Sequence, residues 1–354
     1  MSLEEAGPET AANPMITRRY LMALTFGLIV ARRAAEVAAE SLPGSWSKAR
    51  PLPIPVQEIY PVAFEGQIIL AGGIIEGRAG ELRASDRTDI YQPADNSWID
   101  GPKLPMALHH PGLVTTPDRV LAIGGFAVER GGFWQMQQSV FSLERDLTAW
   151  TRTQELPAPR AEFVAAFLGD RVVLVGGRTP RAGGRNADYG DHRDTTEVLV
   201  LDPETLSWER AAPASIARNS AAGAVLNGRL HVVGGRFGTA RGIENLAIHE
   251  AYDPMTDRWD ECAPMPKAQG GLAAAVWGGK LYAFGGEFFN KGGGVFAEVW
   301  RYDPQADQWD AMMPMPVPRH GLGAVALDDG IHVIGGATRA GASGRSARHA
   351  VFRP

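Results

Sequence analysis

Arginines and histidines occupy matching places along this chain of 354 residues, at fixed distances from tryptophans. Arg160, Arg218 and Arg319 each stand ten residues after a tryptophan, and His109 and His320 stand eleven residues after one. A guanidinium group binds anions through charge-assisted hydrogen bonds, and histidine exchanges protons near neutral pH. If folding brings these positions together, they predict a site for an anionic or hydroxylated ligand. The alternative is that the arginines are structural residues of a repeated turn.

Two loops that follow glycine pairs carry further candidate ligand-binding residues. The segment RFGTARGIENLAIHE contains Arg236 and Arg241, and the segment EFFNKGGGVFAE contains Glu287, Lys291 and three phenylalanines. Phenylalanine beside polar groups is typical of a sugar-binding platform, and equally of packing between repeats. The two loops therefore remain open to both interpretations.

The most individual loop reads RTPRAGGRNADYGDHRD and is about six residues longer than its counterparts. Oxygen ligands from Asp188, Asp191 and Asp194, together with His192, would suit a calcium ion. Their spacing fits no established calcium-loop pattern, so we expect no metal here. The composition favours a solvated, mobile loop.

A sequence repeat must position all of these residues. A tryptophan precedes a glycine pair by 26 residues in six places. The partners are Trp46 and Gly72, Trp98 and Gly124, Trp150 and Gly176, Trp208 and Gly234, Trp259 and Gly285, and Trp309 and Gly335. Each glycine pair follows an apolar, β-prone run that is entered through a hairpin-type turn. Six copies at one offset indicate a repeat protein built from short strands.

The six tryptophans of the repeat follow one another at intervals of 50 to 58 residues. A period of this length with a tryptophan and a glycine pair resembles the kelch motif, in which one repeat forms one four-stranded blade of a β-propeller. The glycine pair would follow the second strand, and the tryptophan would open the fourth. The resemblance implies that the loops after the second strand and the loops between blades share one face, so the candidate residues would meet at a common mouth.

The two ends of the chain predict how the ring closes. After Gly335-Gly336 the chain has one more strand, ending in HAVFRP, and then lacks a fourth. The segment from Trp46 to Pro53 is a fourth strand without a blade of its own. We therefore predict an all-β, six-bladed kelch β-propeller over residues 41–354, closed by pairing of the N-terminal strand into the C-terminal blade.

Composition limits the partners. The net charge of −5 argues against a general nucleic-acid surface, and Cys262 is the single cysteine. We expect a monomer that needs no cofactor and binds a small polar or anionic ligand or a protein. Galactose oxidase is a kelch enzyme with a copper site, but Cys262 follows Trp259, away from the expected mouth, so that chemistry is not expected.

Residues 1–40 form a separate N-terminal extension in this interpretation. The segment from Thr17 to Met22 reads TRRYLM and precedes an uncharged run, which resembles a twin-arginine export signal. Leu21 stands where phenylalanine is favoured, and Met15 is an alternative start. The uncharged run is too short to span a bilayer as a helix. We therefore expect export, to the periplasm, without a stable membrane span in the mature chain.

The fold and the export signal are together similar to those of N-acetylneuraminate mutarotase, an exported six-bladed kelch enzyme. Its proposed site uses a Gly-Glu pair followed by an arginine, and Gly286-Glu287 matches the first half. The arginine is absent, and Lys291 is the nearest cation in the loop. Ring opening needs an acid and a base, so the resemblance makes Glu287 and Lys291 the weak catalytic candidates. Ligand or partner binding is the favoured function, and sugar mutarotation is the alternative.

Overall fold

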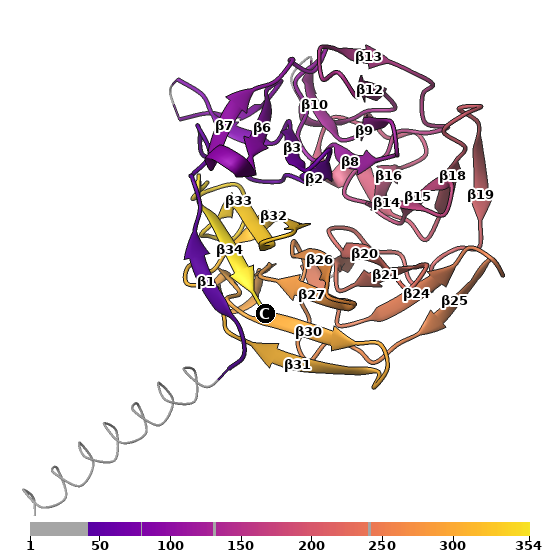
Figure 1. The fold of residues 1–354 in the computed structure, drawn as a ribbon. Helices are drawn as coiled ribbons and strands as arrows, with labels where there is room; N and C mark the ends of the chain where they lie inside the picture. The colour runs from indigo at the N-terminus through magenta and orange to yellow at the C-terminus, as the bar shows by residue number, and fades with distance from the viewer. Residues whose placement is uncertain (1–41, 79, 130–131, 240–241) are drawn as a thin grey trace, which may run out of the picture. The chain divides into compact units, whose positions relative to one another are not determined.

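The computed structural model describes residues 42–354 apart from 79, 130–131 and 240–241. Pro43–Pro354 form one compact unit. Its strands form six four-stranded antiparallel sheets, which surround a common axis as the blades of a propeller (Figure 1). The described residues contain only three short 3-10 helices besides strands. The all-β, six-bladed prediction is therefore confirmed.

The blades follow one another along the chain. Blade 1 contains β2 (Val62–Phe64), β3 (Gln67–Ala71), β6 (Thr88–Gln92) and β7 (Ser97–Asp100). Blade 2 contains β8 (Gly112–Thr115), β9 (Arg119–Ile123), β12 (Val140–Glu144) and β13 (Trp150–Arg152). Blade 3 contains β14 (Val164–Leu168), β15 (Arg171–Val175), β18 (Val198–Leu201) and β19 (Trp208–Ala211). Blade 4 contains β20 (Ala222–Leu226), β21 (Arg229–Val233), β24 (His249–Asp253) and β25 (Arg258–Glu261).

The last two blades complete the ring. Blade 5 contains β26 (Ala273–Trp277), β27 (Lys280–Phe284), β30 (Val299–Asp303) and β31 (Gln308–Met312). Blade 6 contains β32 (His320–Leu327), β33 (Gly330–Ala337), β34 (His349–Arg353) and β1 (Ser45–Lys48). In Figure 1 the indigo β1 lies beside the yellow β34, and Trp46 pairs with Phe352. The N-terminal strand thus closes the C-terminal blade, as the sequence predicts.

Five blades carry an extra two-stranded hairpin between their second and third strands. The hairpins are β4 (Ile74–Glu76) with β5 (Leu82–Ala84), β10 (Phe126–Glu129) with β11 (Gly132–Met136), β16 (Arg178–Pro180) with β17 (His192–Asp194), β22 (Arg236–Thr239) with β23 (Gly242–Asn245), and β28 (Glu287–Phe288) with β29 (Gly294–Val295). The 3-10 helices are η1 (Pro93–Asp95), η2 (Tyr189–Asp191) and η3 (Asn290–Gly292).

The repeated tryptophan and glycine pair have distinct structural roles. In every blade the tryptophan pairs across the two outer strands with one aromatic or leucine residue, as Tyr252 pairs with Trp259. The first glycine of each pair has a positive φ, +75° at Gly72 and +62° at Gly234. A Cβ at Gly72 would lie 2.7 Å from the carbonyl oxygen of Leu108, so the following blade packs directly against this backbone. The glycine pairs therefore stand where the backbone of the next blade approaches closely.

The hydrophobic core is divided among the blade interfaces. One cluster joins the first two blades through residues such as Ile69 and Phe141, and another joins the last two through Phe284 and Phe352. The described residues include no helix that is long and apolar enough to cross a membrane. The predicted export segment lies within residues 1–41, outside the described part of the chain.

Candidate functional site

A repeated backbone bridge positions the side chains at the mouth. The residue that lies 28 positions after each repeat tryptophan directly follows the glycine pair. In five blades this residue forms an isolated β-bridge with the residue that lies eleven positions after the same tryptophan. The bridges are Gln57 with Ile74, His109 with Phe126, Ala161 with Arg178, Asn219 with Arg236, and Gly270 with Glu287. The bridges bring Arg178, Arg236 and Glu287 to corresponding places in three successive blades.

The next residue in each blade forms a ring around the axis. These six residues all have a left-handed φ, and they are Glu58 (57°), His110 (55°), Glu162 (56°), Ser220 (49°), Gly271 (67°) and Gly321 (55°). Five backbone N–H groups of the ring donate to the carbonyl of the preceding blade, for example Gly271 to Ser220 over 2.9 Å. Because only glycine adopts this backbone without cost, the four other residues hold strain at the mouth.

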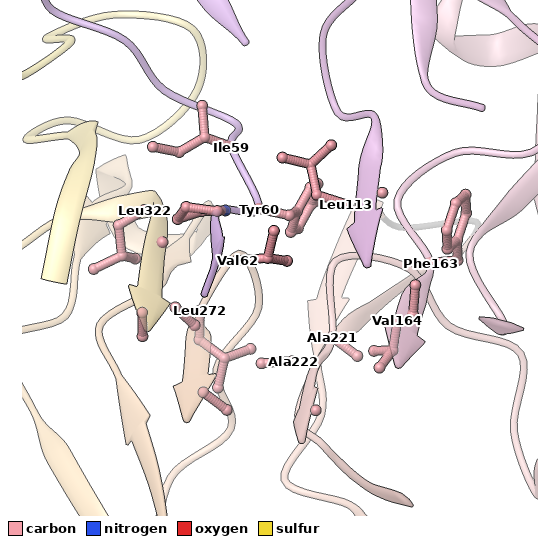
Figure 2. A pocket seen from close by; sticks show the side chains of 18 residues that line it. Ile59, Tyr60, Val62, Leu113, Phe163, Val164, Ala221, Ala222, Leu272 and Leu322 are labelled. Carbon is pink, nitrogen blue, oxygen red and sulfur yellow. The ribbon is translucent and has the colours of Figure 1, made fainter. Parts of the chain in front are cut away.

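The ring lies between two cavities. On the mouth side is a cavity of about 200 Å³ whose wall includes the aromatic residues Trp134, Tyr189 and Phe289. On the other side the first strands of all six blades surround a channel space of about 180 Å³, with mostly apolar side chains (Figure 2). The two cavities share no lining residue. Polar chemistry is therefore concentrated at the mouth cavity.

Glu162 is the centre of a buried charge network on the floor of the mouth cavity. Its Oε1 atom accepts a hydrogen bond from the Ser220 hydroxyl at 2.9 Å and lies 3.6 Å from Arg236 Nη2. Its Oε2 atom lies 3.8 Å from Arg178 Nη1 and has no hydrogen-bond partner. Arg178 stacks on the Tyr189 ring at 3.5 Å from the centroid. Burial and the charge of Glu162 raise the pKa of Tyr189 to about 12, so its hydroxyl stays protonated.

The histidine pair beside Glu58 has a defined proton arrangement. Nε2 of His109 lies 2.8 Å from the carbonyl oxygen of Phe133, so this nitrogen carries the proton. Burial lowers the pKa of His109 well below its usual value, which leaves Nδ1 as an acceptor for His110 Nδ1 at 2.8 Å. His110 Nε2 faces Glu58 Oε2 at 3.0 Å. Burial would raise the pKa of Glu58, but the adjacent histidines outweigh it and hold the pKa well below its ordinary value.

Glu287 and His320 complete the network, and both are buried. Glu287 pairs with Arg236 of the preceding blade and accepts a hydrogen bond from the Gly341 N–H at 2.7 Å. His320 Nδ1 lies 3.3 Å from Glu287 and 3.6 Å from Glu58. Of the predicted residues, the structure thus brings Arg236, Glu287 and His320 together. His109 contacts His110, which in turn faces Glu58 of the same network.

The three arginines that follow tryptophans lie elsewhere. Arg160, Arg218 and Arg319 are at most 2% exposed, and each donates to the carbonyl of the first glycine in its own blade. Arg160 and Arg218 also pair with Glu197 and Glu250. Burial lowers the pKa of Arg319 to about 10. The expectation that the three guanidinium groups converge on one entrance is wrong, and their contacts fit the alternative of structural residues in the repeat.

The remaining candidates divide in two. Arg241 and the side chain of Lys291 lie outside the described part of the structure. The long loop of blade 3 forms the hairpin β16–β17 rather than an unstructured segment. Its acidic groups have separate partners, since Asp191 accepts from the N–H groups of Ala187 and Asp188. The groups of possible metal ligands among the described residues lie outside this loop.

The sequence interpretation missed several residues of the cavity wall. Trp134, from β11, is the clearest, because it lies in none of the loops considered and contacts His109 and Tyr189 with centroid separations of 5.0 and 5.2 Å. Arg178 and Tyr189 were assigned to a solvated loop. Counting 28 residues from each tryptophan would have placed Arg178 beside Arg236 and Glu287.

Comparison with known proteins agrees with this architecture. A family model described as the KLHDC2/KLHL20/DRC7 kelch-repeats domain matches residues 182–346. Kelch-like protein terF of Aspergillus terreus is 25% identical over 248 residues, which cover 69% of this chain and 52% of that protein. Kelch-like protein 36 of Bos taurus is 26% identical over 243 residues, which cover 68% of this chain and 37% of that protein. Kelch-like protein 25 of Xenopus tropicalis is 31% identical over 161 residues, which cover 44% of this chain and 26% of that protein.

The chain spans about half or less of the length of these relatives. Kelch propellers are typically protein-interaction modules. The chain is a kelch-repeat six-bladed β-propeller, because it has six repeats with a common tryptophan–glycine spacing, six blades closed into one ring, and these matches.

Proposed function

We propose that the mouth cavity binds a small, neutral, polyhydroxylated molecule of the carbohydrate class. The cavity volume of about 200 Å³ is suited to one sugar ring. Trp134, Tyr189 and Phe289 supply aromatic surface for the apolar face of such a ring. Glu162 Oε2 and Gln57 Oε1 are buried acceptors without a partner, and hydroxyl groups would satisfy them.

The observation that carries the proposal is the placement of strained and charged residues on the cavity floor. Glu58, His110 and Glu162 are buried, and all three have a left-handed backbone that glycine adopts without cost. A buried charge network contributes little net stability compared with apolar packing. Strain and buried charge gathered at one opening are therefore better explained by ligand recognition than by folding.

The charges favour a neutral ligand over a sugar acid. Three carboxylates, Glu58, Glu162 and Glu287, line the cavity, and Arg236 is the one arginine among its lining residues. In the protein without a bound cation, these carboxylates repel an anionic ligand. Arg160, Arg218 and Arg319 suggested an anionic ligand, but they bind carbonyl oxygens inside the blades and so do not support one.

Calorimetric titration with neutral hexoses, N-acetylhexosamines and hexuronic acids tests the proposal. We expect a neutral sugar to bind, and Glu162→Gln to weaken it about tenfold or more because a charged acceptor is lost. Glu250→Gln is the matched control, since Glu250 is also a buried carboxylate paired with an arginine but lies inside blade 4. Absence of binding by every sugar, or equal weakening by both variants, would contradict the proposal.

A second candidate function is sugar mutarotation, and the Arg236–Glu287 pair favours it. The sequence after Gly286-Glu287 lacks an arginine, and the neighbouring blade supplies one to the same carboxylate. A carboxylate and a cation at a hydroxyl-binding floor could move the proton of a ring-opening hemiacetal. Exchange spectroscopy on an equilibrated sugar should then show faster anomer interconversion with the parent protein and no acceleration with Glu287→Gln. No acceleration by the parent would exclude this reaction and leave the binding proposal unaffected.

A further inference from the structure

Three buried hydrogen-bond acceptors converge on one point of the cavity floor. His320 Nδ1 lies 3.3 Å from Glu287 Oε1 and 3.6 Å from Glu58 Oε1. The three residues are 0%, 1% and 8% exposed. His320 Nδ1 has no hydrogen-bond partner. Glu287 Oε1 also accepts from Arg236 and Glu58 Oε2 faces His110, so His320 Nδ1 is the buried atom of this group that is left without a partner. An ion bound between the two carboxylates would give this nitrogen a partner.

The other side of the His320 ring determines which nitrogen is free. Nε2 lies 2.9 Å from the carbonyl oxygen of Arg339 and 3.1 Å from that of Gly341. Carbonyl oxygens only accept, so Nε2 carries a proton, and Nδ1 is the nitrogen that holds the lone pair in the neutral ring. A backbone carbonyl that fixes the tautomer in this way is the usual outer support of a histidine that ligates a metal.

The distances fit one small divalent ion. Ligand atoms bound at about 2.1 Å to the same ion lie at most about 4.2 Å apart. Both His320 separations fall below this limit, and all the ligand atoms of the group lie within 4.8 Å of one another. A small movement of one carboxylate completes the set. Glu58 and Glu287 also line the mouth cavity, so the ion would keep open positions towards it.

We propose that Glu58, Glu287 and His320 bind a divalent first-row transition metal ion, such as Mn²⁺, Fe²⁺ or Zn²⁺, at the floor of the mouth cavity. Two carboxylate oxygens and one imidazole nitrogen suit these ions better than Ca²⁺ or Mg²⁺, which prefer oxygen ligands alone. The carboxylates that line the cavity attract the ion, and Arg236, which donates to Glu287 Oε1, remains an outer hydrogen-bond partner of a ligating carboxylate. The metal site stands whether or not a sugar binds.

A second group of possible ligands, His231, His249 and Cys262, provides a comparison. His231 Nδ1 lies 2.9 Å from His249 Nε2, so each of these nitrogens already has a partner. Blade 6 repeats the same pair, with His332 Nδ1 at 2.7 Å from His349 Nε2 and no cysteine in the group. The paired histidines thus recur as a packing feature of the blade, whereas His320 Nδ1 has no hydrogen-bond partner.

Equilibrium dialysis against Mn²⁺ alone, followed by elemental analysis, tests the proposal without any sugar. We expect one Mn²⁺ per chain for the parent, and at least tenfold weaker binding for His320→Ala and Glu58→Gln. Glu58→Gln keeps the shape of the side chain, so it remains informative if His320→Ala fails to fold. Glu250→Gln and Cys262→Ser are controls that should retain one Mn²⁺.

Three other outcomes would contradict the proposed metal site. The first is a parent protein that binds less than one Mn²⁺ per chain at saturation. The second is equal binding of Mn²⁺ by the parent and by both ligand variants. Loss confined to Cys262→Ser would place the ion in the His231 group instead. Since no sugar is present, none of these results bears on carbohydrate binding, and failure of the sugar titration leaves the metal result standing.

Discussion

At the scale of the residue, the role of an arginine is set by the oxygen atoms that its guanidinium group reaches. Arg218 lies ten residues after a tryptophan and reaches the carbonyl oxygens of Gly234 and Ile248 and the carboxylate of Glu250. Arg236 lies 28 residues after the same tryptophan and reaches Glu287 on the cavity floor. The first holds a blade together, and the second forms part of a site.

Replacing Arg218 with alanine should destabilise the fold strongly. The substitution leaves the buried Glu250 carboxylate uncompensated, which costs about 3–5 kcal/mol of unfolding free energy. Urea denaturation measures the loss. Arg185→Ala is the control, because Arg185 forms an exposed pair with Asp188 at 2.8 Å and exposed pairs contribute about 1 kcal/mol at most. Similar unfolding midpoints for the two variants would contradict the structural role of Arg218.

The sequence alone could not separate these two roles. Arginines at one repeated position indicate a shared environment, but they do not say whether their side chains point along the blade or towards the axis. Glu58, His110 and Glu162 each lie twelve residues after a repeat tryptophan, but their contacts depend on bringing different blades together. Trp134 gave no signal, because its place in the cavity depends on the register of the hairpin β10–β11.

At the scale of the element, the strands were predictable because the repeat presents the same pattern six times. The tryptophan offset identified the fourth strand of each blade, including β1, which lies far from its sheet in sequence. The hairpins β4–β5 to β28–β29 were not predicted. Their residues differ from blade to blade, so repetition could not reveal them.

Deleting residues 41–53 should destabilise the propeller far more than deleting residues 1–14. The longer deletion removes β1 and exposes the edge of β34. It also removes Trp46, which packs against Phe352 at 4.9 Å between ring centroids and donates to the carbonyl oxygen of Met313. Truncating a large aromatic residue in a core costs about 3–5 kcal/mol. Thermal unfolding compares the two truncations, and equal melting temperatures would be inconsistent with closure through β1.

At the scale of the whole molecule, we propose that the protein is exported by the twin-arginine route. Replacing Arg18 and Arg19 with lysine should leave the full-length precursor in the cytoplasm, because the route recognises the arginine pair. Cell fractionation with immunodetection measures the distribution. Lysine keeps the positive charge, so the substitution tests recognition rather than charge. An unchanged distribution would argue against this route.

The ring of six left-handed residues does not connect all neighbouring blades in the same way. A backbone hydrogen bond joins Glu58 to Gly321 across the chain closure, but within the described part of the structure no such bond joins Glu162 to His110, where blades 2 and 3 meet. Between the same two blades, the side chain of Asn186 in blade 3 donates one hydrogen bond to the backbone of Met136 in blade 2 and accepts another from it, each 3.0 Å long. The long loop of blade 3 therefore supplies side-chain hydrogen bonds to blade 2 at the interface where the ring bond is missing, so removing the Asn186 side chain should weaken this interface.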